Sequence, residues 1–161
     1  MGRILVSYFS ASGVTRRLAE KIARVLEADT FEIVPKIQYT TEDLKWPSKT
    51  NRSFLEMKNR SSRPKIMYRL GNPEDYDVVF LGFPIWYDAA PTIINTFIEE
   101  NDLTGKDVYI FVTSGVHSVE RSFRDLQRTY PYIRFISGKR FSGSFRPKDV
   151  FNWIECRSLS Y

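Results

Sequence analysis

The chain has 161 residues, of which 42% are hydrophobic and 15% aromatic, and this size and composition predict one globular domain over residues 1–161. The net charge of +5 comes without an ordered pattern of basic and aromatic residues, so we expect no nucleic-acid partner. One cysteine and one histidine exclude an internal disulfide framework, a CxxC motif and a histidine cluster for a metal.

The first apolar run, residues 4–9, predicts a buried strand. It is too short for an export signal or a membrane span, so we expect a cytoplasmic protein that does not contact a membrane. Apolar residues then recur at a spacing of four, which predicts a helix with one apolar face made by Val14, Leu18, Ile22 and Leu26.

The loop between this strand and this helix carries three hydroxyls and a glycine within six residues: Ser10, Ala11, Ser12, Gly13, Val14 and Thr15. A loop at a helix start turns unpaired amides toward one point, at the positive end of the helix dipole, and this geometry binds phosphate. Hydroxyls before a helix are also ordinary caps, but one would satisfy that need. The loop therefore favours phosphate binding.

The rest of the chain alternates strands and helices. Strands are predicted at residues 30–34, 76–82, 108–112 and 133–136, the last with a continuation to Phe141 left open, and helices at residues 91–98, 118–128 and from Pro147. Their inward faces are predicted to be Ile94, Phe97 and Ile98, then Phe123 and Leu126, then Val150, Phe151 and Ile154. Residues 36–72 form a long surface excursion with a helical turn near residues 53–58.

This alternation predicts an α/β fold with a parallel sheet and right-handed crossovers. In a five-stranded sheet of order 2-1-3-4-5, a ligand lies beyond the carboxyl ends of strands one and three. The loops that follow the first, third and fourth strands therefore converge on one crevice. The second of these loops contains Pro84, Ile85, Trp86 and Tyr87, and the third contains Thr113, Ser114, Gly115 and His117.

Two segments carry a family resemblance, Gly82-Phe83-Pro84-Ile85-Trp86-Tyr87 and the run from Gly105-Lys106 to Thr113-Ser114-Gly115. Together with the first loop, they resemble the short-chain flavodoxin-like family, as does the excursion through Tyr39, Arg52, Glu56 and residues 60–64. The resemblance implies a flavodoxin-like three-layer sandwich, FMN held non-covalently, and activity as a one- or two-electron carrier.

The resemblance also implies a role for each loop. The first would hold the FMN phosphate, the aromatic rings of Trp86 and Tyr87 would stack on the flavin, and residues 113–115 would meet its pyrimidine edge or give a second ring contact. The alternative for either aromatic residue is that its ring packs into the core. His117 would donate a proton or pair with the charge of the reduced ring, unless it is merely exposed.

Two departures from the family pattern carry expectations. Val14 stands where asparagine is common, so one side-chain hydrogen bond to FMN would be lost and the affinity lowered. Asp88 stands where glycine often follows the aromatic pair, and we expect a non-glycine residue there to be penalised at positive φ.

Two other functions remain open on the same fold: an NAD(P)H-dependent quinone or flavin reductase, and a binding module that has lost FMN. The redox partners are unknown, and a homodimer is open. Charge is uneven, with nine Lys or Arg against three Asp or Glu in residues 36–70 and one against eight in residues 71–115, which could steer a charged partner.

Overall fold

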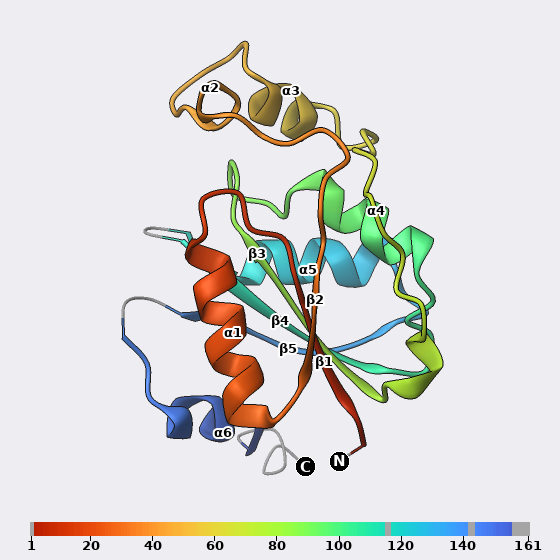
Figure 1. Cartoon of the computed structure of the whole chain (residues 1–161). Coiled ribbons are helices and arrows are strands. Elements are labelled where there is room, and N and C mark those ends of the chain that lie inside the picture. Colours follow the sequence, from red (N-terminus) through yellow and green to blue (C-terminus); the bar gives the residue numbers. More distant parts are fainter. Residues whose placement is uncertain (1, 115–116, 142–143, 156–161) are drawn as a thin grey trace.

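The computed structural model describes residues 2–114, 117–141 and 144–155 (Figure 1). The strands are β1 (Ile4–Tyr8), β2 (Asp29–Glu32), β3 (Val78–Pro84), β4 (Asp107–Thr113) and β5 (Arg134–Phe141). The helices are α1 (Val14–Leu26), α2 (Thr41–Leu44), α3 (Arg52–Lys58), α4 (Thr92–Glu100), α5 (Glu120–Thr129) and α6 (Pro147–Glu155), with a 3-10 turn η1 at Pro73–Asp75.

The strands form one parallel sheet of order β2-β1-β3-β4-β5, which confirms the predicted topology. β3 is central and almost wholly buried, as its continuous apolar sequence predicts. β5 runs unbroken to Phe141, so the continuation left open by the sequence is real, and it carries a register shift beside Val108 and Tyr109 of β4. Gly138 is required within it, because a Cβ there would lie 2.9 Å from the Val119 side chain.

Alternate residues of the strands feed two apolar layers. One layer lies between the sheet and α4 and α5, and the other between the sheet and α1 and α6 (Figure 1). Ile94, Phe97 and Ile98 of α4 and Leu126 of α5 are buried as predicted, and Phe123 is partly buried against the same layer. The sequence thus identifies the inward faces of α4 and α5.

The predicted faces of α1 and α6 need correction. In α1, Leu18 and Ile22 are buried as predicted and Leu26 is partly buried, but Val14 is 49% exposed, and Thr15, Ala19 and Ala23 are buried without having been predicted. In α6 the buried residues are Val150 and Trp153, whereas Phe151 is 45% exposed. In α1, a spacing of four drifts around a helix of 3.6 residues per turn, and the small residues Ala19 and Ala23 were not counted. In α6, Phe151 directly follows Val150 and therefore points about 100° away from it around the helix.

Residues 36–65, here called the cap segment, leave the sheet after β2 and return beside it. An antiparallel bridge joins Pro35 to Ile66, and the amide of Lys36 donates to the Lys65 carbonyl at 2.8 Å. Between these ends lie α2 and α3, the second of which confirms the helical turn expected near residues 53–58. The cap segment lies beyond the carboxyl ends of β1 and β3, at the top of Figure 1.

Candidate functional site

The loop from β1 to α1 is ordered by Ser10. Its hydroxyl oxygen accepts hydrogen bonds from the amides of Gly13 and Arg16, each at 3.1 Å, and Gly13 takes a φ of 92° as the N-cap of α1. Ser10 is therefore an internal cap, which is the structural alternative stated for these hydroxyls. Among the described residues, the amides of Ser12, Val14 and Thr15 have no hydrogen-bond partner.

The start of α1 is electropositive. Its first turn contains no acidic residue, so the positive end of the helix dipole is not compensated there. Arg16 and Arg17 follow directly; Arg16 is paired with Glu32, and a Cβ built on Gly13 would lie 3.5 Å from Nη1 of Arg17. Unpaired amides and a guanidinium thus lie close together at this helix start, a combination of groups that suits an anion.

The loop after β3 is a tight hairpin. Trp86 and Ala89 exchange both backbone hydrogen bonds at 3.0 Å, and the two residues between them, Tyr87 and Asp88, have φ values of 47° and 67°. Positive φ at both central positions is typical of a type I′ turn. Asp88 therefore adopts the positive φ that we expected to be penalised at a non-glycine residue. Aspartate tolerates this conformation better than most residues.

The Asp88 carboxylate is held by one side chain from the third loop and one from α5. It accepts a hydrogen bond from Nη1 of Arg121 at 2.8 Å and lies 3.3 Å from Nδ1 of His117. His117 is 43% exposed, and its amide donates to the Ser114 hydroxyl at 2.8 Å. The second and third loops are thereby joined through side chains.

The third loop also meets the first. The hydroxyls of Thr15 and Thr113 are 2.8 Å apart and share a hydrogen bond, so the expected phosphate and ring-edge residues touch each other directly. Thr15 is buried at 2% exposure, so this hydrogen bond lies inside the junction between the two loops. Gly115, expected to contact the ligand, lies outside the described residues.

The two aromatic residues of the hairpin have different neighbours. Trp86 packs edge-on against Phe9 and Tyr39, with ring centroids 5.5 and 5.2 Å apart, and borders the apolar layer under α4. Tyr87 packs edge-on against Phe54 of the cap segment, at 5.5 Å. Both rings are half-buried, so each packs in part against its aromatic neighbours and keeps part of its surface exposed, and stacking on a flavin stays a prediction.

Two pockets lie side by side under the cap segment. One, of about 270 Å³, brings together predicted residues with new ones and is lined by Leu44, Trp46, Ser53, Ile85, Trp86, Tyr87, Ser114 and His117. The other, of about 450 Å³, lies next to the first loop and is lined by Ala11, Ser12, Tyr39, Thr41, Glu42, Leu44 and Lys45. Leu44 borders both, so the pockets adjoin there.

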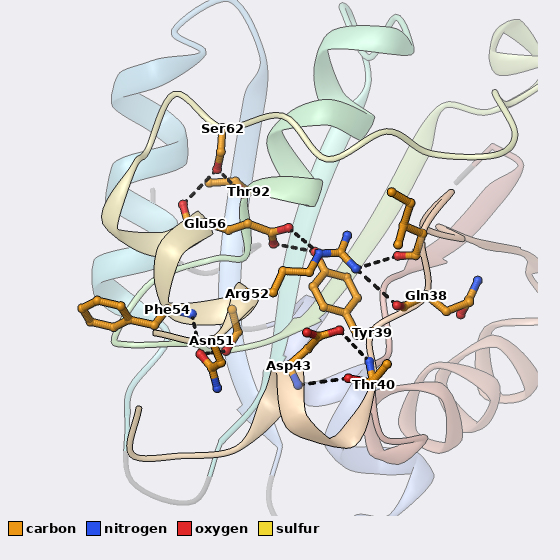
Figure 2. Close-up of polar contacts among 12 residues, drawn as sticks. Gln38, Tyr39, Thr40, Asp43, Asn51, Arg52, Phe54, Glu56, Ser62 and Thr92 are labelled. Carbon is orange, nitrogen blue, oxygen red and sulfur yellow. Dashed lines mark hydrogen bonds and ion pairs between the residues drawn. The ribbon is translucent and has the colours of Figure 1, made fainter. Parts of the chain in front are cut away.

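The cap segment holds its shape through a network centred on Arg52 (Figure 2). The guanidinium donates to Glu56 at 2.8 Å and to the Ile37 carbonyl at 2.7 Å, and it lies over the Tyr39 ring at 3.7 Å. Tyr39 in turn donates its hydroxyl to Glu56 at 2.6 Å. Burial, and then this hydrogen bond, raise the pKa of Tyr39 well above its usual range.

Local sequence explains why the cap segment folds. Thr40 and Asp43 form a reciprocal capping box at the start of α2, and the Asn51 side chain accepts from the Phe54 amide at 3.1 Å to start α3. The Asn51 amide group also donates to the Lys45 carbonyl at 2.7 Å. Sequence reasoning missed the pocket residues Leu44, Trp46 and Ser53, although these two capping signals were legible.

In residues 2–114, 117–141 and 144–155, no group of three or more histidine, cysteine, aspartate or glutamate side chains could hold a metal ion. None of the helices in these ranges is long and apolar enough to cross a bilayer. The cytoplasmic location and the homodimer stay predictions.

The sheet order and the three loops that meet at its carboxyl edge define a doubly wound α/β protein whose first loop ends in a positive-φ glycine at the start of α1. The chain belongs to the flavodoxin family, since the model of that family, described as Flavodoxin, matches residues 3–157. No curated protein matches the chain.

Solved structures agree with this assignment. Proteins from Bacteroides eggerthii and Bacteroides uniformis, both named only provisionally as flavoproteins, are 41% and 42% identical, with TM-scores of 0.95 and 0.90. The first match covers 99% of this chain and 100% of that one, and the second 96% and 98%. A Lactobacillus acidophilus flavoprotein solved in complex with FMN shares the fold at 19% identity, with a TM-score of 0.73 and coverage of 96% and 99%.

Proposed function

We propose that this chain binds FMN non-covalently and serves as an electron carrier. The observation that carries the proposal is the set of amides at the start of α1. Ser12, Val14 and Thr15 leave their amides without a partner among the described residues, around a glycine at a φ of 92°. Unpaired amides near the protein surface are well suited to a phosphate dianion.

The charge of the site supports the same ligand. A phosphate monoester carries close to two negative charges at neutral pH, and it would lie at the uncompensated positive end of α1 beside Arg17. Thr15 and Thr113 would contribute indirectly, since the hydrogen bond between their hydroxyls fixes the first loop against the third.

The adjoining pockets support a flat ring joined to that phosphate. The ring would lie among Ile85, Trp86 and Tyr87, with Ser114 and His117 offering polar atoms to its edge. Pro84 ends β3 directly before these residues, and the Ile85 amide, which donates to the Thr113 carbonyl at 3.1 Å, fixes where the hairpin begins. When bound, FMN supplies one- and two-electron transfer, and the residues of the chain bind it, orient it and exclude water.

A carrier is proposed in preference to a reductase because the described residues contain one loop of this phosphate-binding geometry. A nicotinamide dinucleotide would bring phosphates of its own, and no second loop in the described ranges pairs a positive-φ glycine with unpaired amides at a helix start. The complex of the distant Lactobacillus acidophilus protein with FMN adds support for the cofactor.

The test uses the purified full chain. We expect it to bind FMN at one equivalent per chain, measured by quenching of flavin fluorescence, and its flavin to be bleached by dithionite but not by NADPH alone. Failure to bind FMN would refute the proposal. Bleaching by NADPH alone, followed by transfer to a quinone, would replace the carrier with a reductase.

A further inference from the structure

Trp46 belongs to the cap segment and lines the pocket that we propose holds the flavin ring. Its side chain is 74% exposed, yet it lines the same pocket of about 270 Å³ as Trp86 and Tyr87. Tryptophan buries 150–250 Å² when it is covered, so an indole held in the open beside a pocket is a large unused binding surface. The resemblance that pointed to the three loops assigned nothing to this residue.

The other two rings of this pocket already have aromatic neighbours. Trp86 packs against Phe9 and Tyr39, and Tyr87 packs against Phe54. Trp46 makes no ring contact within the described residues. It therefore keeps the most aromatic surface available for a ligand.

The backbone that carries Trp46 is held in place before any ligand binds. The Asn51 side chain donates to the carbonyl of Lys45, the preceding residue, at 2.7 Å, and to the Glu42 carbonyl at 3.2 Å. These bonds fix the exit from α2 against the start of α3. An indole on a fixed backbone loses less freedom on binding than one on an unrestrained loop.

The cap segment is in turn anchored to the body of the protein on its α4 side. Ser62 shares a hydrogen bond with Thr92 at 2.9 Å, and Arg60 donates to the Ala90 carbonyl at 2.9 Å (Figure 2 shows the first contact). On the α2 side, the Tyr39 ring packs against Phe9 and Trp86, and the Tyr87 hydroxyl donates to the Ser48 carbonyl at 3.5 Å. Contacts on both sides therefore hold the part of the cap segment that carries Trp46 beside the pocket.

From these contacts we propose that Trp46 is a cofactor-binding residue and that its indole covers the flavin ring from the cap segment. The inference rests on the proposed FMN function and extends it to a wall of the site that the three loops do not supply. Leu44 borders both pockets, so the cap segment covers the ring and the chain that leads to the phosphate.

The test compares Trp46→Ala and Trp46→Phe with Tyr68→Ala, a matched control because Tyr68 is also an exposed aromatic residue, at 58%, and does not line either pocket. Affinities for FMN and for riboflavin, which lacks the phosphate, are measured by flavin fluorescence. We expect Trp46→Ala to weaken both ligands by the same factor, about tenfold, with Trp46→Phe in between and Tyr68→Ala unchanged.

Several results would overturn the inference. If the wild-type chain binds FMN and Trp46→Ala binds it equally well, Trp46 has no such role, and the proposed function stands. If Trp46→Ala weakens FMN but not riboflavin, the indole acts near the phosphate and not on the ring. If the wild-type chain binds neither ligand, the proposed function is wrong, and the inference that rests on it is wrong as well. Circular dichroism verifies that each variant is folded, as expected for such an exposed side chain.

Discussion

Replacing Gly13 with alanine tests directly whether the loop from β1 to α1 binds the phosphate of FMN. Gly13 has a φ of 92°, and an ideal Cβ there meets only Nη1 of Arg17, at 3.5 Å, which is ordinary contact. The cost of Gly13→Ala is therefore conformational, and an L-residue forced into this region costs about 1–2 kcal/mol. In a chain of this length each kcal/mol lowers Tm by about 2–4 °C, so we expect a fall of roughly 2–8 °C.

The same substitution should weaken FMN binding. Relief of the strain would rotate the peptide that carries the Val14 amide, and a hydrogen bond to a charged group contributes about 1.5–3 kcal/mol. Loss of that one bond corresponds to tenfold or more in affinity. Urea unfolding gives the stability, and fluorescence titration with FMN and riboflavin gives the affinity, where only FMN should respond strongly.

Gly105→Ala is the matched control. Gly105 has a φ of 80°, no atom within 4 Å of an ideal Cβ, and a place in the turn before β4, at the opposite end of that strand from the site. It should lose stability as Gly13→Ala does and keep its FMN affinity. Equal and unchanged FMN affinities in both variants would show that the loop does not hold the phosphate.

Three further outcomes follow from single side chains. Val14→Asn should tighten FMN about fivefold by restoring a hydrogen bond, with little change in stability because this side chain is 49% exposed; an unchanged affinity in titration would contradict this. Tyr39→Phe should lower the free energy of unfolding in urea by about 1–2 kcal/mol, because it removes the hydroxyl bond inside the cap network. Hydrogen bonds from the Tyr76 hydroxyl and then from Arg3 hold the pKa of Asp29 below its usual 3.8. The charged carboxylate therefore stabilises the fold above pH 3.8, and this contribution is lost as the pH falls through the lowered pKa. Asp29→Asn should reduce the dependence of the free energy of unfolding on pH in this range, measured in urea.

Sequence reasoning reached the strands and the three loops because these depend on local signals, and the resemblance implied the fold whose strand order the structure shows. Buried parallel strands have continuous apolar sequences, as in β3. The signal for a candidate anion-binding loop lies in adjacent residues such as Ser12 and Gly13. Their meeting at one edge follows from topology alone. These parts of the site could be predicted without coordinates.

The parts that were missed depend on contacts between distant residues. The exposure of Val14 and Phe151 reflects how closely α1 and α6 approach the sheet, which apolar spacing does not encode. Arg52 and Tyr39 are polar residues in a charged stretch, and only the fold shows that the Arg52 guanidinium lies over the Tyr39 ring. Trp46 was likewise invisible as a pocket residue, because its position depends on the α2–α3 caps.

The cap segment leaves and rejoins the body at a single point, where Pro35 pairs with Ile66 and the Met67 amide donates to the Val34 carbonyl at 2.8 Å. Because the two ends of the cap segment pair with each other, residues inside it can change without moving the flanking strands, as long as contacts to the body such as Ser62–Thr92 and Tyr39–Trp86 are kept. The outer wall of the pocket can thus be rebuilt by evolution or by design while the first loop, carried by β1 and α1, stays as it is.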